Sequence, residues 1–121
     1  MAVSFNLFAR GDIVDINDQI KSQLEENPVI IYMKGTPQAP QCGFSSRTVQ
    51  ALMGCGERFA FVNILDNQEL REALKTYSNW PTYPQLYING ELVGGCDIVL
   101  ELSESGELAE MVKGAANRQE A

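Results

Sequence analysis

Two short segments, residues 29–33 and 59–64, constrain the fold of this 121-residue chain more than any other feature. The first is continuously apolar and rich in β-branched residues, which is typical of a short strand buried on both faces. The second is an aromatic and β-branched run that predicts another strand. Between them, Val49, Leu52 and Met53 mark the inner face of a predicted helix. A strand–helix–strand order of this kind requires two parallel strands joined by a right-handed crossover.

The rest of the sequence extends this unit on both sides. Apolar residues at helical spacing predict helices before the first strand, after the second strand and at the C-terminal end. A strand at 85–88 is joined to a short partner strand at 92–93 by Asn89-Gly90, a strong hairpin signal. The order αβαβαββα therefore predicts an α/β fold in which a four-stranded mixed sheet is flanked by helices.

The length of the chain is suited to one domain with a real core. The first eleven residues carry one basic and no acidic residue, and we expect them to form a flexible N-terminal extension. The domain itself is expected to span residues 12–113, and residues 114–121 are expected to form a frayed C-terminal tail.

Composition excludes several classes of function. Sixteen acidic against nine basic residues give a net charge of −7, which argues against nucleic acid as a partner. No apolar stretch approaches the roughly 18 residues of a membrane span, so no membrane partner is expected. The chain has no histidine, which removes Cys–His catalytic pairs and Cys/His zinc sites. Three irregularly spaced cysteines do not form a secreted disulfide framework, and we expect a reduced, cytoplasmic protein.

The strongest candidate for chemistry is Cys42, which begins the motif Cys42-Gly43-Phe44-Ser45. It follows a strand and a Gly/Pro loop and precedes a predicted helix. Free N–H groups and the helix dipole stabilise a thiolate there, and such cysteines have pKa values of roughly 3.5–7.5. A buried, inert cysteine is the less favoured alternative. Because Ser45 stands where a second thiol could sit, no disulfide forms within the motif, and Cys42 needs a partner from elsewhere.

The two other cysteines differ from Cys42 in their settings. A continuous helix would place Cys55 about 20 Å from Cys42 at 1.5 Å per residue, so the two cannot share a metal. We expect Cys55 to be structural. Cys96 follows two glycines at a predicted helix start, where it is either a reactive thiol or a small residue that lets a ligand approach the backbone.

Several charged residues lie near the predicted ends of the strands. Lys34 ends the first strand, Arg71 and Lys75 are four residues apart on one helix, and Asp97 follows Cys96. Each has an ordinary explanation, as a solvated charge or, for Asp97, as a helix cap. Taken together, a thiolate, three cations and an acid suit an anionic peptide that carries one ammonium group.

The segment Trp80-Pro81-Thr82-Tyr83-Pro84-Gln85 cannot be helical, because it contains two prolines. Pro84 directly precedes a strand and is a candidate for a cis peptide bond, which would expose the backbone of Tyr83 to an extended ligand. The alternative is a rigid turn in which Trp80 is a hydrophobic plug, and the local sequence favours it.

Four motifs, in this order, resemble those of the monothiol glutaredoxins with a Cys-Gly-Phe-Ser active site. They are Lys34-Gly35-Thr36-Pro37, Cys42-Gly43-Phe44-Ser45, Trp80-Pro81-Thr82-Tyr83-Pro84-Gln85 and Gly94-Gly95-Cys96-Asp97. The resemblance runs from about residue 13 to residue 113. It implies a thioredoxin fold with Pro84 in cis and a glutathione site around Cys42.

The resemblance also assigns roles within that site. Lys34 and Arg71 would hold the glycine carboxylate of glutathione, and the backbone of Tyr83 would pair with its cysteinyl portion. Cys96 and Asp97 would receive the γ-glutamyl end.

Members of this class resemble iron–sulfur carriers more than reductases. A [2Fe–2S] cluster typically takes four thiolates, and this chain offers one suitable thiol, Cys42. Two chains and two glutathiones supply four, which predicts a cluster-bridged homodimer in iron–sulfur cluster assembly and iron homeostasis. The resemblance implies a BolA-like protein as an alternative partner and apo iron–sulfur proteins as recipients.

The competing function is that of a glutathione-dependent monothiol oxidoreductase that removes glutathione from mixed disulfides. Such a reaction needs no second cysteine in the protein, so Ser45 does not exclude it. The long loop Gly35–Gln41 resembles an insertion, relative to dithiol glutaredoxins, that disfavours the reductase geometry. We therefore expect at most weak enzyme activity.

Overall fold

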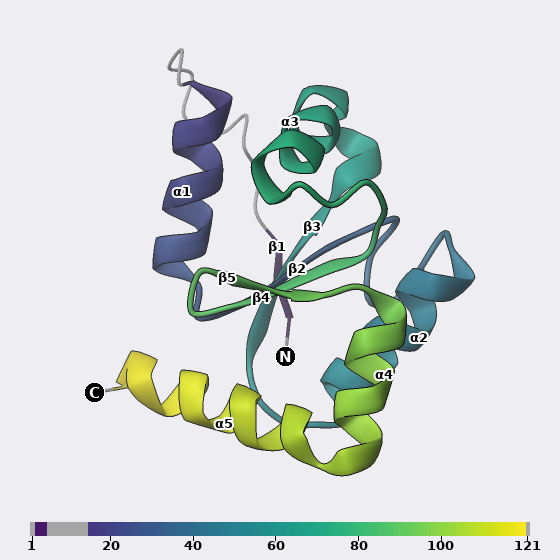
Figure 1. The fold of residues 1–121 in the computed structure, drawn as a ribbon, viewed down its shortest axis with the longest axis vertical. Helices are drawn as coiled ribbons and strands as arrows, with labels where there is room; N and C mark the ends of the chain where they lie inside the picture. Colours follow the sequence, from purple (N-terminus) through teal and green to yellow (C-terminus); the bar gives the residue numbers. More distant parts are fainter. Residues whose placement is uncertain (1, 5–14, 121) are drawn as a thin grey trace.

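The computed structural model describes residues 2–4 and 15–120, and they form an α/β fold with a central sheet between two layers of helices (Figure 1). The strands are β1 (Ala2–Ser4), β2 (Val29–Met33), β3 (Phe59–Asn63), β4 (Gln85–Ile88) and β5 (Glu91–Gly94). The helices are α1 (Ile16–Glu26), α2 (Gly43–Met53), the short 3₁₀ helix η1 (Ile64–Asp66), α3 (Gln68–Ser78), α4 (Cys96–Ser105) and α5 (Glu107–Glu120).

The sheet is mixed and has the strand order β1-β3-β2-β4-β5. The β2–α2–β3 unit has parallel strands, as the sequence predicts, and β4 and β5 form an antiparallel hairpin. β4 also runs antiparallel to β2. The four expected strands are thus confirmed, and this arrangement is the thioredoxin fold.

A fifth strand, β1, extends the sheet beyond the four that the sequence predicts. It pairs in parallel with β3, from Ala2 opposite Phe59 to Ser4 opposite Phe61. Residues 2–4 therefore depart from the expected flexible extension, while Met1 and residues 5–11 lie outside the described residues. β3 would otherwise present unpaired N–H and C=O groups along one edge, and β1 satisfies them.

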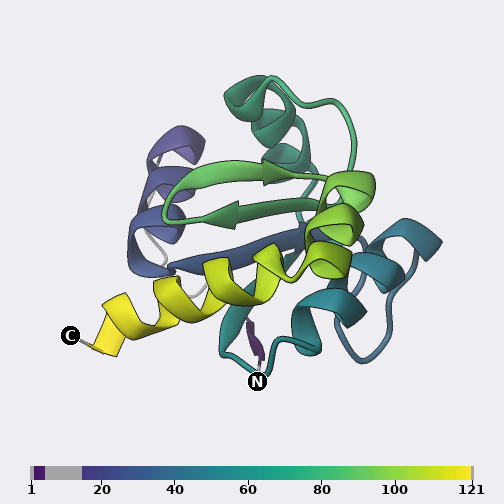
Figure 2. The same ribbon diagram turned by 60° about the horizontal axis from the view of Figure 1, so that its bottom comes forward.

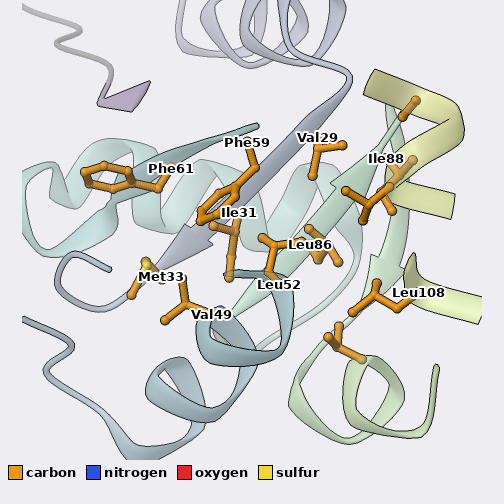
Figure 3. Packing of buried hydrophobic residues seen from close by; sticks show 13 residues of the cluster. Val29, Ile31, Met33, Val49, Leu52, Phe59, Phe61, Leu86, Ile88 and Leu108 are labelled. Carbon is orange, nitrogen blue, oxygen red and sulfur yellow. The ribbon is translucent and has the colours of Figure 1, made fainter. Parts of the chain in front are cut away.

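Two separate hydrophobic clusters form because successive side chains of β2 point to opposite faces of the sheet. Val29, Ile31 and Met33 pack with α2, α4 and α5, as the close view in Figure 3 shows for part of that cluster. Ile30 and Tyr32 pack on the other face with α1 and α3. Figures 1 and 2 show the two helical layers on opposite sides of the sheet.

The C-terminal end of the chain also differs from expectation. The sequence predicts fraying from residue 114, but α5 continues to Glu120. The reason is that Ala115 is buried in the first cluster, together with Leu108 and Val112. These three residues lie at helical spacing and keep the helix against the sheet. Among the described residues, no helix is long and apolar enough to cross a membrane.

Candidate functional site

The strand register brings four chain segments to one end of the sheet. Tyr32, near the end of β2, pairs with Gln85 at the start of β4. Leu86 pairs with Gly94 at the end of β5, and Met33 pairs with Asn63 at the end of β3. Four segments therefore lie close together at this end: those that follow β2 and β5, the one that precedes β4, and the start of α3.

The loop between β2 and α2 is a tight reversal that places Cys42. Gly35 has a φ of +97°, and a Cβ there would lie 2.6 Å from the carbonyl oxygen of Ala39, so only glycine fits. The N–H of Gln41 donates to the carbonyl of Lys34 at 2.9 Å, and the N–H of Gly35 donates to Oδ1 of Asn63 at 2.9 Å. The loop is thus held at both ends and delivers the chain to the start of α2.

Cys42 is the N-cap residue of α2, and it is only partly buried. The backbone N–H of Ser45 lowers the pKa of this thiol below its usual range, with smaller contributions from the N–H of Phe44 and the charge of Lys34; partial desolvation opposes them. A thiolate at this position is the nucleophilic and metal-ligating form of cysteine.

Ser45 has a structural role beside this thiol. It is fully buried, and its Oγ accepts a hydrogen bond from the N–H of Lys34 at 3.1 Å. The hydroxyl therefore ties the first turn of α2 to the end of β2. This bond explains why a polar residue occupies a buried position one helical turn after Cys42.

A groove of about 590 Å³ opens beside Cys42. The structure brings all six predicted site residues into its walls: Lys34, Cys42, Arg71, Tyr83, Cys96 and Asp97. Lys75 and the segment Trp80–Pro84 complete the lining, together with Phe44, Gly95 and Ile98. Lys34 and Arg71 have no ion-pair partner among the described residues, so the groove holds uncompensated positive charge in an acidic protein.

The segment before β4 forms one wall of the groove, and the peptide bond between Tyr83 and Pro84 is cis, as the resemblance to the monothiol glutaredoxins implies. Gly95 lies against this wall, because a Cβ there would be 3.3 Å from the carbonyl oxygen of Pro84 and 3.4 Å from Nε1 of Trp80. Trp80 is therefore a wall residue of the groove as well as a partly buried ring.

Two buried donors of groove residues have no hydrogen-bond partner among the described residues: Nε of Arg71 and Nε1 of Trp80. A buried polar group without a hydrogen bond costs about 1–3 kcal/mol. Both atoms belong to residues that line the groove, so a ligand with carboxylate or carbonyl oxygens fits there. The tripeptide glutathione has such oxygens at both ends, and this observation supports its fit.

Cys96 is buried as the first residue of α4, while Asp97 beside it is exposed. The N-cap residue of this helix is Gly95, which has no capping side chain. The first N–H groups of α4 are therefore open to an anion at the groove. Cys55 lies outside the groove, where it packs against the first hydrophobic cluster and burial raises the pKa of its thiol.

Two exposed apolar residues at the groove are missed by the sequence reasoning. Phe44 is 54% exposed and Ile98 is 37% exposed, although both are large and hydrophobic. The guanidinium of Arg47 lies over the Phe44 ring, 5.4 Å from its centre. The available signal was their position in the first turns of α2 and α4, next to the predicted site residues.

Within the part of the chain that the structure describes, no three cysteine, aspartate or glutamate side chains gather to hold a metal ion. Cys42 offers one partly exposed thiolate in the groove.

Comparisons with known proteins agree with this geometry. Residues 29–93 match the glutaredoxin family. The chain is 57% identical over 99 residues to Glutaredoxin 4 of Buchnera aphidicola subsp. Acyrthosiphon pisum, covering 82% of this chain and 92% of that protein.

Solved structures show the same similarity. The reduced apo form of poplar GrxS14 has a TM-score of 0.69 and 48% identity, covering 83% of this chain and 92% of that one. A buckwheat glutaredoxin–glutathione complex has a TM-score of 0.67 and 26% identity, covering 83% and 94%. With its single cysteine in the Cys42–Ser45 motif, the chain belongs to the glutaredoxin family as a monothiol member similar to Glutaredoxin 4.

Proposed function

We propose that this protein is a glutathione-dependent carrier of [2Fe–2S] clusters, acting in iron–sulfur cluster assembly and iron homeostasis. The observation that carries the proposal is the partly exposed thiol of Cys42, whose pKa is lowered, beside a groove in which two buried donors have no partner among residues 2–4 and 15–120. One such thiol per chain is too few for a cluster, and a bound ligand with its own thiol makes up part of the deficit.

Glutathione is the proposed ligand of the groove. Arg71 and Lys34 would bind its glycine carboxylate, and the backbone of Tyr83 would pair with its cysteinyl portion. The uncapped start of α4 at Cys96 suits the α-carboxylate of the γ-glutamyl group, and Asp97 suits its ammonium. The complex of the related buckwheat glutaredoxin with glutathione supports this choice of ligand.

The cluster would lie between two chains. Each chain contributes Cys42 and one bound glutathione, which gives four thiolates in total. The exposed side chains of Phe44 and Ile98 beside the groove support the approach of a second protein surface there. That second surface is another copy of this chain or a BolA-like protein, and recipient apo iron–sulfur proteins would approach from the same side.

The lowered pKa of Cys42 also favours a second candidate function, glutathione-dependent oxidoreductase chemistry. The thiolate would attack the glutathionyl sulfur of a mixed disulfide and release the protein thiol. A second glutathione would then attack the Cys42–glutathione disulfide, releasing glutathione disulfide and restoring the thiolate. The loop that ends at Gln41 supports the carrier as the main function, because it resembles the insertion that disfavours this reaction.

Anaerobic reconstitution with iron, sulfide and glutathione tests the proposal. We expect a coloured protein whose native mass corresponds to two chains, one [2Fe–2S] cluster and two glutathiones. Omission of glutathione should prevent cluster binding, because two of the four ligands are then missing. A colourless monomer after reconstitution, together with rapid reduction of a glutathionylated peptide, would replace the carrier with the oxidoreductase.

Two cysteine variants identify the protein ligand. Cys42→Ser should abolish the visible absorption of the cluster, whereas Cys55→Ser should retain it, because Cys55 lies outside the groove. Cys55→Ser is the matched control, since it removes one thiol from the same chain. A cluster retained by Cys42→Ser would contradict the ligand assignment.

A further inference from the structure

The wall formed by Trp80–Pro84 is the segment between α3 and β4, and both backbone and side-chain bonds hold it in place. One of these bonds comes from Tyr83. Its side chain is 6% exposed, and its hydroxyl donates to the carbonyl oxygen of Arg71 at 2.6 Å. The bond joins the wall to the first turns of α3, which carry one of the groove's cations.

We propose that the Tyr83 hydroxyl is a positioning group that sets the guanidinium of Arg71 in the groove for a carboxylate of the bound peptide. This inference rests on the proposed glutathione site. Tyr83 does not act on the ligand through its hydroxyl, because that hydroxyl is engaged by α3. Its effect on the ligand passes through Arg71.

The state of Arg71 supports this role. Its backbone carbonyl is bonded to Tyr83, while its buried Nε has no hydrogen-bond partner in the part of the chain that the structure describes. The guanidinium is therefore partly desolvated, and its Nε can donate to an acceptor bound in the groove. Preorganisation of this kind lowers the cost of ordering a side chain when a ligand binds.

The hydroxyl remains a donor under all ordinary conditions. Burial raises the pKa of Tyr83 well above its usual value, with a smaller opposing effect from the charge of Arg71. The hydroxyl therefore keeps at neutral pH the proton that it donates to the Arg71 carbonyl.

The other end of the wall is also held, which makes the Tyr83 bond effective. Gln85 is fully buried, and its Nε2 donates to the carbonyl of Trp80 at 3.1 Å and to that of Thr82 at 3.3 Å. Its Oε1 accepts from the hydroxyl of Tyr87 at 3.0 Å. The side chain of Gln85 thus fixes the loop relative to β4, and the hydroxyl of Tyr83 fixes the same loop relative to α3.

The test is Tyr83→Phe, which removes one oxygen atom and keeps the ring. Glutathione binding to the ¹⁵N-labelled reduced protein is followed by NMR chemical shifts, which report weak as well as tight binding. We expect the Kd to rise about 2- to 12-fold, the range that corresponds to the cost of ordering one long side chain on binding.

Tyr32→Phe is the matched control. Tyr32 is fully buried, and its hydroxyl donates to Oε1 of Gln23 at 2.7 Å, on the α1 side of the sheet and away from the groove. Its loss should lower the Tm without changing the Kd for glutathione. Equal increases of Kd in both variants would show a general structural effect and overturn the proposal.

A double-mutant cycle shows whether Tyr83 acts through Arg71. Arg71→Lys alone should weaken binding, and adding Tyr83→Phe should weaken it no further. Glutathione with an amidated glycine carboxylate should bind wild type and Tyr83→Phe equally. Additive losses in the cycle, or a Kd unchanged by Tyr83→Phe, would overturn the positioning role. No shift changes in the wild-type protein would instead overturn the glutathione site itself.

Discussion

At the scale of single residues, Cys42 and Ser45 divide two tasks within one helical turn. Cys42 is partly exposed and its pKa is lowered mainly by the backbone N–H of Ser45. The side chain of Ser45 is buried and bonded to the N–H of Lys34. The residue that replaces a second thiol is therefore an anchor for the helix start, and the activation of Cys42 does not depend on another ionisable side chain in the motif.

The titration of Cys42 is the first testable consequence. In Cys55→Ser, the alkylation rate of Cys42 should reach half its maximum below pH 8.5, the ordinary thiol value. Lys34→Gln should move this midpoint upward only slightly, because the Ser45 N–H contributes more than the Lys34 charge. An unchanged midpoint near pH 8.5 in the Cys55→Ser protein would contradict the lowered pKa.

The same pKa has a consequence for stability. A thiol whose pKa is lower in the folded than in the unfolded state stabilises the fold at high pH. This contribution is complete above the unfolded value of about 8.5 and disappears as the pH falls through the lowered value. Cys42→Ser should therefore flatten the pH dependence of the unfolding free energy in that window, as urea titrations at several pH values would show.

At the scale of elements, the loops before and after α2 depend on backbone geometry that few residues allow. The loop after β2 reverses at Gly35, and the chain after α2 turns at Gly56, whose φ is +73°. A Cβ at Gly56 would meet no atom within 4 Å, whereas one at Gly35 would overlap the backbone of Ala39 and Gln41. Both positions require a positive φ, but only Gly35 lacks the space for a Cβ.

This difference makes Gly35→Ala and Gly56→Ala a matched pair. Gly56→Ala should lower the unfolding free energy by about 1–2 kcal/mol, the cost of a positive φ for an L-residue. Gly35→Ala should cost about 2–4 kcal/mol, because overlap with the loop backbone adds to that strain. Urea unfolding measures both values, and similar losses in the two variants would contradict the close packing of the loop.

The elements themselves follow largely from the sequence. The buried strand Val29–Met33 is evident because a short, continuous β-branched run is typical of a strand buried on both faces. Asn89-Gly90 identifies its hairpin directly. The site residues could be grouped from their motifs. What escaped was the bond from Tyr83 to Arg71 and the exposure of Phe44, because both depend on how separate elements pack.

At the scale of the whole molecule, the sheet separates two hydrophobic clusters, one on each face, and it has one strand more than the sequence predicts. β1 has three residues and no periodic pattern that would reveal it, since a strand can pair through backbone groups alone. The end of α5 was missed for a related reason, because only the packing of Ala115 against the sheet shows that the helix continues.

Removal of residues 1–4 tests the contribution of β1. The amide N–H groups of β3 that face β1 should exchange with deuterium faster, because they lose their partners. Glutathione binding should be unaffected, because β1 pairs with β3 at one edge of the sheet, while the described lining of the groove comes from α2, α3 and the segments next to β2, β4 and β5. Hydrogen exchange measured by mass spectrometry on the intact and shortened chains compares them, and identical exchange in residues 59–61 would contradict the pairing.

Trp80 gives the groove one more property. It is the single tryptophan of the chain, it lines the groove beside Gly95, and its indole N–H has no partner within the described ranges. Indole fluorescence responds to hydrogen bonding and to the polarity of its surroundings. The tryptophan emission of this protein therefore depends on the environment in the groove. The intrinsic fluorescence of Trp80 should therefore change when a peptide binds in the groove or a second chain binds at the same face, and it can be followed in real time without any label.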